Sequence, residues 1–113
     1  MSLPIVDPDK LLEIMGHDSG LIRECFQDFL QSEQEMLDDI RQALDRSGAE
    51  ALVFAAHKLK GSLGCLAAAP AVEAAEALER AGRSKTMEQG YELLEELEFQ
   101  CSRLRAFIRT FRP

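Results

Sequence analysis

Apolar residues recur along the chain every three or four positions, the spacing that gathers them on one face of an α-helix. The longest run begins at Leu21, and three further runs follow it. In order, the runs comprise Ile22, Cys25, Phe26, Phe29, Leu30, Met36, Leu37, Ile40 and Leu44; Leu52, Ala56, Leu59, Leu63 and Leu66; Val72, Ala75 and Leu78; and Leu94, Leu97, Cys101, Leu104, Ile108 and Phe111, widened by Leu93 and Phe107. No strand pattern competes with this spacing. The sequence therefore predicts four long amphipathic helices.

A shorter helix is predicted ahead of these four. Asp7 can cap free backbone N–H groups with its carboxylate, and Pro8 suits the first helical position because no amide hydrogen is needed there. Gly16 tolerates the left-handed conformation that ends many helices, and Asp18 or Ser19 can cap the helix that follows. The short helix is therefore expected to end at Gly16.

Capping and helix-breaking residues divide the rest of the chain. Ser47 and Glu50 have the spacing of a capping box, in which the serine oxygen and the glutamate each bond a free backbone N–H. Thr86 and Gln89 repeat this relation, and Pro70 marks a break and restart of the helix. We expect helices to begin at both capping boxes and at the proline.

The helix after the proline is expected to end near Gly82. Its outward, polar face would comprise Glu73, Glu76, Glu79 and Arg80. Since the connections between all five segments are short, the predicted fold class is all-α: an antiparallel four-helix bundle with a short additional N-terminal helix. We expect one domain over residues 7–111 and a flexible N-terminus over residues 1–6, where Met1-Ser2-Leu3 could be left from cloning.

Charge and composition narrow the range of functions. The 113 residues carry a formal net charge of −7, and the basic residues are scattered among acids, so the basic surface that nucleic acids require is missing. The same acidity argues against an anionic membrane surface, and no apolar stretch approaches the ~20 residues that span a bilayer. We therefore expect a soluble protein without nucleic-acid or direct membrane binding.

The cysteines and the second histidine give no support for a metal site. Cys25, Cys65 and Cys101 are odd in number and far apart, and we interpret them as small core residues. His17 follows the first helix and receives no role. Free thiols and the lack of a charged and apolar leader favour a cytoplasmic location. Glu33 interrupts an apolar stripe; it could be a buried, paired carboxylate, but we expect a boundary residue near a bundle end.

The segment from Ala56 to Gly64 holds residues that a stable helix does not need. Gly61 and Gly64 lie inside a predicted helix, where each glycine costs about 1 kcal/mol relative to alanine. His57, Lys60 and the two glycines are three, four and seven residues apart, so they share a stripe beside the apolar core face. A ring nitrogen, an ammonium one turn away and a notch free of side chains would form a docking site for an anion and a partner.

Each of these residues also has an ordinary explanation. A single helical histidine is more often a surface or cap residue, and Lys60 alone is an ordinary solvated charge. Those explanations give no reason for the two glycines, so the combination favours a docking site. Close packing of the glycines against another helix remains an open alternative.

The motif His57-x-x-Lys60-Gly61-Ser62, with its flanking residues, resembles the phosphohistidine motif of histidine phosphotransfer (HPt) domains. The flanking matches are Ala56, Leu59, Gly64, Leu66 and Ala68, and the wider ones are Asp7, Leu11, Gly16, Asp18, Leu21, Phe29, Leu37, Leu44, Leu78 and Glu79. The resemblance covers roughly residues 7–111. Cys65 stands where the family often has a polar residue and Ala67 where it often has glycine, differences that concern partner preference.

The resemblance implies a phosphorelay intermediate. His57 would be the phosphoacceptor, and Lys60 would help to neutralise the phosphoryl group. Gly61 would let a receiver domain reach the imidazole, within a docking surface that comprises Gly61, Gly64, Lys58 and Ser62. The partners would be receiver domains of response regulators or of hybrid sensor histidine kinases. The magnesium site and the reacting aspartate would belong to the receiver.

The chain itself is expected to supply only the nucleophile and the docking face. It has no phosphate-binding loop, no Gly-rich nucleotide fold and no carboxylate cluster beside His57, so we expect no cofactor of its own and no autonomous kinase activity. A free imidazole is a competent nucleophile near pH 7 because its unperturbed pKa is about 6.5. We expect a monomer.

Two other functions would also place a histidine on a helix. The main alternative is a non-catalytic helical adaptor in which His57 is incidental. The phosphoacceptor region of a sensor kinase also uses a helical histidine, but it needs a two-helix hairpin and an adjoining ATP domain, neither of which we find in the sequence.

Overall fold

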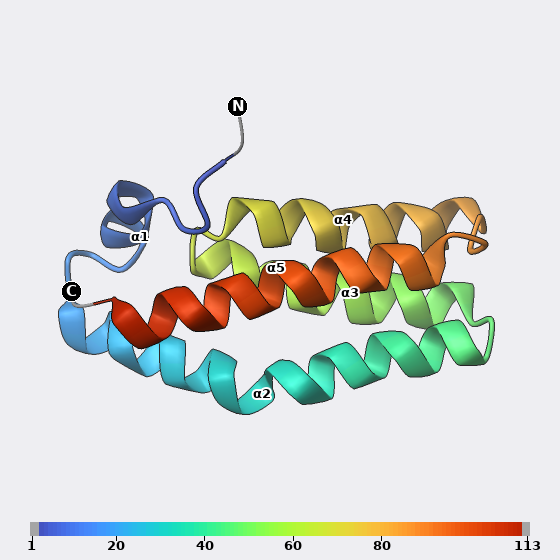
Figure 1. Cartoon of the computed structure of the whole chain (residues 1–113), viewed down its shortest axis with the longest axis horizontal. Helices are drawn as coiled ribbons and strands as arrows, with labels where there is room; N and C mark the ends of the chain where they lie inside the picture. Colours follow the sequence, from blue (N-terminus) through green and yellow to red (C-terminus); the bar gives the residue numbers. More distant parts are fainter. Residues whose placement is uncertain (1–2, 112–113) are drawn as a thin grey trace.

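A computed structural model describes residues 3–111, which fold into five helices (Figure 1). The short helix α1 spans Pro8–Ile14, and the long helices are α2 (Ser19–Asp45), α3 (Ala49–Cys65), α4 (Ala69–Ser84) and α5 (Gly90–Thr110). The described residues contain no strand. The predicted all-α fold with a short additional N-terminal helix is therefore confirmed.

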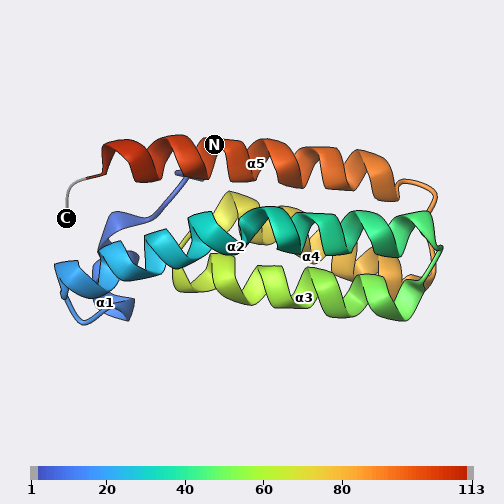
Figure 2. The same cartoon turned by 90° about the horizontal axis from the view of Figure 1, so that it is seen from below.

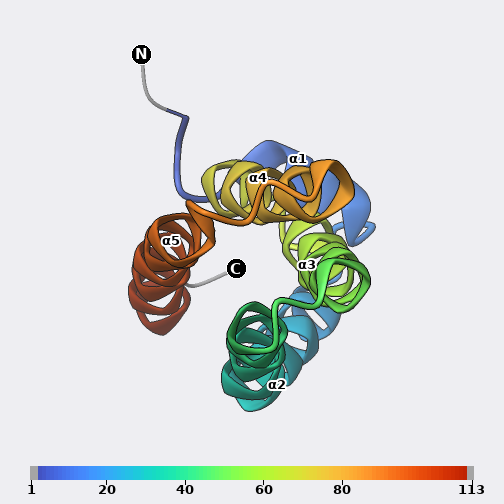
Figure 3. The same ribbon diagram turned by 90° about the vertical axis from the view of Figure 1, so that its right-hand side faces the viewer.

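The four long helices run along one common axis, and each is antiparallel to the next in the chain (Figures 1 and 2). Viewed end-on, they form a ring in the order α2, α3, α4, α5, so that α3 and α5 lie on opposite sides (Figure 3). The pairing of α3 with α4 is the most extensive in the bundle, and that of α2 with α5 is much smaller. A side chain between α3 and α4 can therefore be held by both helices.

Helix α1 lies across the end of the bundle where α3 passes into α4 (Figure 1). The backbone N–H of Asp7 bonds the carbonyl of Ala67 in this connection, at 3.0 Å. Val6 is buried and Ile5 packs against the core, so the chain contacts the bundle before α1 begins. Of the segment predicted to be flexible, residues 1 and 2, including the start of the suspected cloning remnant, lie outside the described residues.

The core is built mainly from leucine and alanine, as the apolar spacing predicts. Its fully buried side chains include Leu52, Leu59, Leu63, Leu78, Leu94, Leu97 and Leu104. One prediction on the edge of the α2 stripe is wrong, because Leu30 is 39% exposed. The stripe passes from Phe29 to the buried Glu33 instead, which leaves Leu30 on the flank of the helix.

The cysteines do not all lie in the core. Cys101 is fully buried on α5, but Cys25 is half-buried and Cys65 is exposed. Cys65 is the last residue of α3 and lies off the stripe of Leu59 and Leu63. The interpretation of all three as core residues is therefore wrong for Cys65.

The predicted starts of the first two helices are confirmed. Asp7 accepts a hydrogen bond from the backbone N–H of Lys10 at 3.2 Å, and Asp18 accepts one from Leu21 at 3.1 Å. Gly16 follows α1 with φ of +63°, the left-handed conformation expected there. The next residue, His17, is left-handed as well.

Neither capping box forms. Gly48 is the N-cap of α3, and Ser47 is left-handed with φ of +53°, because it still belongs to the turn that closes α2. Gln89 is the N-cap of α5 without a side-chain hydrogen bond, and α5 begins at Gly90. Gly90 is buried against Leu44, where a Cβ atom would overlap the leucine side chain. The turn that closes α2 therefore decides the start of α3, and packing against Leu44 decides the start of α5.

Helix α4 restarts around Pro70, as predicted, but it continues through Gly82 to Ser84. Gly82 is buried inside the helix, and a Cβ atom there would lie 2.8 Å from Cγ2 of Val53 and 2.9 Å from the carbonyl oxygen of Ala49. The residue therefore does not end the helix. It allows the backbones of α3 and α4 to approach closely, which brings the preceding turn of α4 over the middle of α3.

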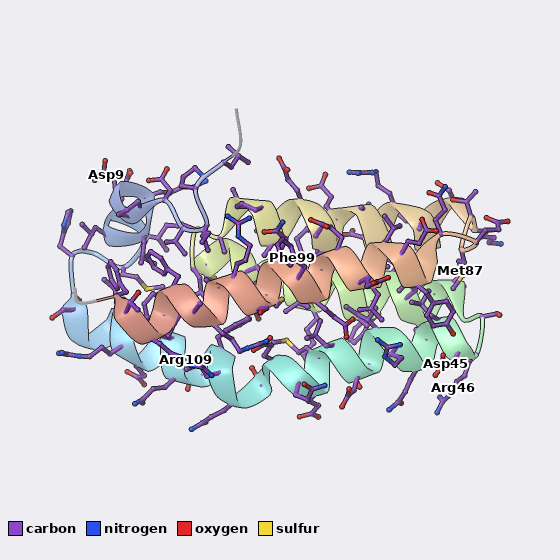
Figure 4. The ribbon with its side chains drawn as sticks, viewed as in Figure 1. Asp9, Asp45, Arg46, Met87, Phe99 and Arg109 are labelled. Carbon is purple, nitrogen blue, oxygen red and sulfur yellow. The ribbon has the colours of Figure 1, made fainter. Side chains whose placement is uncertain are left out.

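Polar contacts join α2 to α5. Glu33 is buried and forms an ion pair with Arg105 of α5, so the expectation of a boundary residue is wrong and the paired carboxylate is correct. Burial raises the pKa of the Glu33 carboxyl, and the Arg105 charge acts against that shift. Arg41 and Glu98 pair at 3.1 Å, and Tyr91 donates to Asp45 near the far end of the bundle (Figure 4).

Candidate functional site

His57 lies in the middle of α3 and points away from the core. Its neighbours Ala56 and Leu59 are fully buried, which fixes the orientation of the helix about its axis. The imidazole is on the other side, with 65% of its side chain exposed. The sequence expectation of a surface histidine beside the core stripe is therefore correct.

One edge of the imidazole is held by Glu79 of α4. Nδ1 of His57 lies 3.4 Å from Oε1 and 3.3 Å from Oε2 of this carboxylate. Only 1% of Glu79 is exposed. Since an ionised carboxylate can only accept, we assign the proton of the neutral ring to Nδ1. That tautomer leaves the lone pair on Nε2, the nitrogen on the opposite edge of the ring.

Two cations share the same carboxylate. Nζ of Lys60 lies 2.8 Å from Oε1 of Glu79, and Nη2 of Arg83 lies 2.5 Å from Oε2. The hydrogen bond from Lys60 has the largest effect on the pKa of Glu79 and lowers it, and His57 and Arg83 lower it further against the effect of burial. Glu79 is therefore ionised at neutral pH, and two cations surround one anion.

The glycines of the motif face open space. A Cβ atom at Gly61 or Gly64 would meet no neighbouring atom within 4 Å. Gly61 is exposed and Gly64 is half-buried. The alternative that these glycines serve close packing against another helix is therefore wrong, and that role belongs to Gly82 instead. Within the described residues, no packing contact at Gly61 or Gly64 offsets the free energy that two glycines cost the helix α3.

The remaining predicted docking residues are placed differently from one another. Lys58 is exposed next to His57. Ser62 is half-buried, and its hydroxyl lies 3.9 Å from Sδ of Met36 on α2, so it is directed away from the imidazole. The structure thus brings Lys60, Gly61 and Lys58 close to His57 but turns Ser62 toward the neighbouring helix.

The apolar spacing predicts Glu79 on the outer face of its helix, and that prediction is wrong, because the residue is buried. Glu79 lies four residues after Ala75 and three before Gly82, both of which are buried on the face of α4 toward α3. A charged residue in a stripe of small buried residues was the available signal. Arg83 follows Glu79 by four residues and was missed for the same reason, since its role depends on the buried acid.

No group of three metal-binding side chains comes together in residues 3–111. In the same part of the chain, no helix has the length and apolar character needed to cross a membrane. The site therefore consists of one imidazole, one carboxylate, two cations and an open helix surface.

Comparison with known proteins identifies the family of this chain. The family model of the Hpt domain matches residues 24–107, a span that includes every residue of this site. The fold is similar to that of histidine-containing phosphotransfer protein B (HptB) from Pseudomonas aeruginosa PAO1, with a TM-score of 0.88 at 22% sequence identity, over 98% of this chain and 100% of that one. No curated protein gives a significant match. Because the family match covers most of the sequence, the chain belongs to the histidine phosphotransfer domain family, the phosphotransfer intermediates of phosphorelay signalling.

Proposed function

We propose that His57 accepts a phosphoryl group from an aspartyl phosphate on a receiver domain and passes it to the aspartate of another receiver. The observation that carries this proposal is the contact of Nδ1 with the buried Glu79, in a histidine whose side chain is otherwise exposed. A partner can approach Nε2 without any movement of the bundle. The other ring nitrogen meanwhile stays hydrogen-bonded.

The step is a displacement at phosphorus. The lone pair of Nε2 forms a P–N bond, and the P–O bond to the receiver carboxylate breaks, which returns that aspartate to its ionised form. The phosphorylated ring carries positive charge while its Nδ1 proton remains, and Glu79 accepts the hydrogen bond from that proton. In the return step a second aspartate attacks phosphorus and the imidazole leaves as the neutral ring.

The charges around His57 suit an incoming phosphoryl group. Lys60 and Arg83 together outweigh the single negative charge of Glu79, in a chain whose formal net charge is −7. Lys60 Nζ has three protons and needs one for Glu79, so it can donate another to a phosphoryl oxygen. Phosphoryl transfer depends mainly on positioning and charge neutralisation, and this cluster supplies both.

The receiver supplies the rest of the active site in this proposal. It brings the magnesium ion and the reacting aspartate, whereas this chain acts as a monomer in the cytoplasm without a cofactor of its own. The chain does not phosphorylate itself from ATP. Receivers of response regulators and of hybrid sensor histidine kinases are both suitable partners.

Labelling with radioactive phosphate tests this function. Receiver domains from a panel are loaded from labelled acetyl phosphate with magnesium and mixed with the chain. At least one receiver should transfer an acid-labile label to it within minutes, whereas ATP and magnesium alone should give none. Absence of transfer from every receiver would favour a non-catalytic adaptor, and labelling by ATP in a partner-free preparation would contradict the carrier role.

Gly61→Gln should separate stability from transfer. Glutamine favours a helix interior over glycine by up to about 1 kcal/mol, and space is open at this position, so the variant should melt at the same temperature or slightly higher. Transfer should slow about tenfold or more, because the new side chain stands in the path of the receiver.

Thermal melts and transfer kinetics on the same samples measure both effects. Gly82→Ala is the matched control for stability, because this glycine, unlike Gly61, has no room for a side chain. Its Cβ would press on Val53 and Ala49 and should lower the free energy of unfolding by about 1–3 kcal/mol. Unchanged transfer in Gly61→Gln would remove the docking role of the glycine.

A further inference from the structure

Phe54 is the most exposed large hydrophobic side chain in residues 3–111. It is 74% exposed, compared with 56% for Phe99 and 49% for Tyr91. Both of those residues have a partner: the guanidinium of Arg103 lies 5.8 Å from the centre of the Phe99 ring, and Tyr91 donates to Asp45. No ring contact or cation accompanies Phe54 in the described residues. The bundle therefore gains little from this phenylalanine.

The position of Phe54 connects it to the phosphoryl site. It precedes His57 by three residues on α3, so the two side chains are surface neighbours separated by about 4.5 Å of helix rise. Lys58, Gly61 and Cys65 continue the exposed stripe at spacings of four, three and four residues. His57 thus lies between an exposed aromatic ring on one side and the open surface of Gly61 on the other.

We infer that Phe54 is the apolar anchor by which this chain holds a receiver domain during transfer. The inference rests on the proposed function of His57, because it takes the receiver as the occupant of this surface. A partner that covers Nε2 of His57 must extend over the adjacent turn of α3. The ring, which is 74% exposed in the free chain, then loses its contact with water under the receiver.

This role predicts an effect on affinity and none on chemistry. Aromatic side chains at the centre of an interface are among the residues whose truncation weakens binding most. In the described residues, Phe54 takes no part in the hydrogen bonds and ion pairs that join His57, Lys60 and Arg83 to Glu79, so the transfer step inside the complex does not depend on it. Phe54 is therefore a binding residue for the receiver and not a catalytic residue.

The test measures the transfer rate against receiver concentration, with the receiver that labels the wild-type chain fastest. Phe54→Ala should raise the half-saturating receiver concentration roughly tenfold, with a maximal rate within about twofold of wild type. Phe54→Leu keeps an apolar side chain and should lose about threefold or less. Melting temperatures should not change, because the ring is exposed.

Phe99→Ala is the matched control, an exposed phenylalanine on α5, on the other side of the bundle from α3 (Figures 3 and 4). It should leave both kinetic parameters unchanged. An unchanged half-saturating concentration in Phe54→Ala, or an equal loss in Phe99→Ala, would overturn the inference. A wild-type chain that no receiver labels would instead overturn the proposed function, so the two failures are distinguishable.

Discussion

Replacement of His57 by glutamine is expected to abolish phosphoryl acceptance and to leave the bundle folded. Glutamine has no nucleophilic ring nitrogen, so no P–N bond can form. The histidine side chain is 65% exposed, so the core loses no packing. Surface substitutions of this kind change the free energy of unfolding by about 0.5 kcal/mol or less. Transfer from a labelled receiver and a thermal melt measure the two effects.

The other histidine of the chain provides the control. His17 is exposed in the connection between α1 and α2, outside the cluster around Glu79. His17→Gln should therefore accept phosphate at the wild-type rate. Acid-labile phosphate on the His57→Gln variant would show that another residue is the acceptor. Loss of phosphate acceptance in His17→Gln would show that His17 is needed for the reaction, and would contradict the assignment of His57 alone.

The helices could be predicted because the signal is repeated many times. Each long helix carries three to nine apolar residues at helical spacing, so single errors such as Leu30 do not change the assignment. Burial of these stripes decides the fold, and the all-α bundle follows from them. The caps of α1 and α2 were also correct, since Asp7 and Asp18 need only their own local backbone.

The predicted capping boxes failed because the turn that closes α2 competes with one and the packing of Gly90 competes with the other. Gly90 must lie against Leu44, and Gly82 must lie against Val53, so these contacts fix where the helices begin and how far they run. A capping box contributes about 1 kcal/mol, which is less than the cost of a steric overlap in the core. Sequence spacing gives no information on which residues of two helices will meet.

The same limit applies to the site. His57, Lys60 and Gly61 are close in the sequence on one helix, and their proximity follows from helical geometry alone. Glu79 comes from another helix, and the register of α4 against α3 is required to bring it to the imidazole. Its position next to a stripe of small residues gave a signal for burial, but no signal for its partners.

Removal of the Glu79 carboxylate should slow transfer more than any other substitution that leaves the nucleophile in place. Glu79→Ala takes away the acceptor that orients Nδ1 of His57 and holds Lys60. The ring can then rotate and change tautomer, and loss of such positioning typically costs about 10- to 100-fold in rate. The free energy of unfolding should fall because the hydrogen bonds and ion pairs to Glu79 are lost. The loss should stay at about 1–3 kcal/mol, because Lys60 and Arg83 can return to water.

Glu79→Gln is the conservative variant, and it separates hydrogen bonding from charge. Its amide oxygen can still accept from Nδ1 of His57, so most of the transfer rate should be retained. Nitrogen NMR of the imidazole should report Nδ1 protonated in the wild type and in Glu79→Gln, and a mixture of tautomers in Glu79→Ala. A purely structural role for Glu79 would leave the tautomer ratio unchanged.

The pH dependence of stability gives an independent test of the carboxylate. Lys60, His57 and Arg83 hold the pKa of Glu79 below its ordinary value of 4.5. Near and below pH 4.5, the folded state therefore binds fewer protons than the unfolded state. The stabilisation is therefore fully present above about pH 5 and is lost as the pH falls through the lowered pKa. The difference in unfolding free energy between wild type and Glu79→Gln should shrink as the pH falls below about 4.5. Chemical denaturation at a series of pH values measures this difference, and a difference that grows as the pH falls below about 4.5 would mean that burial, and not the cations, controls the pKa of this carboxyl.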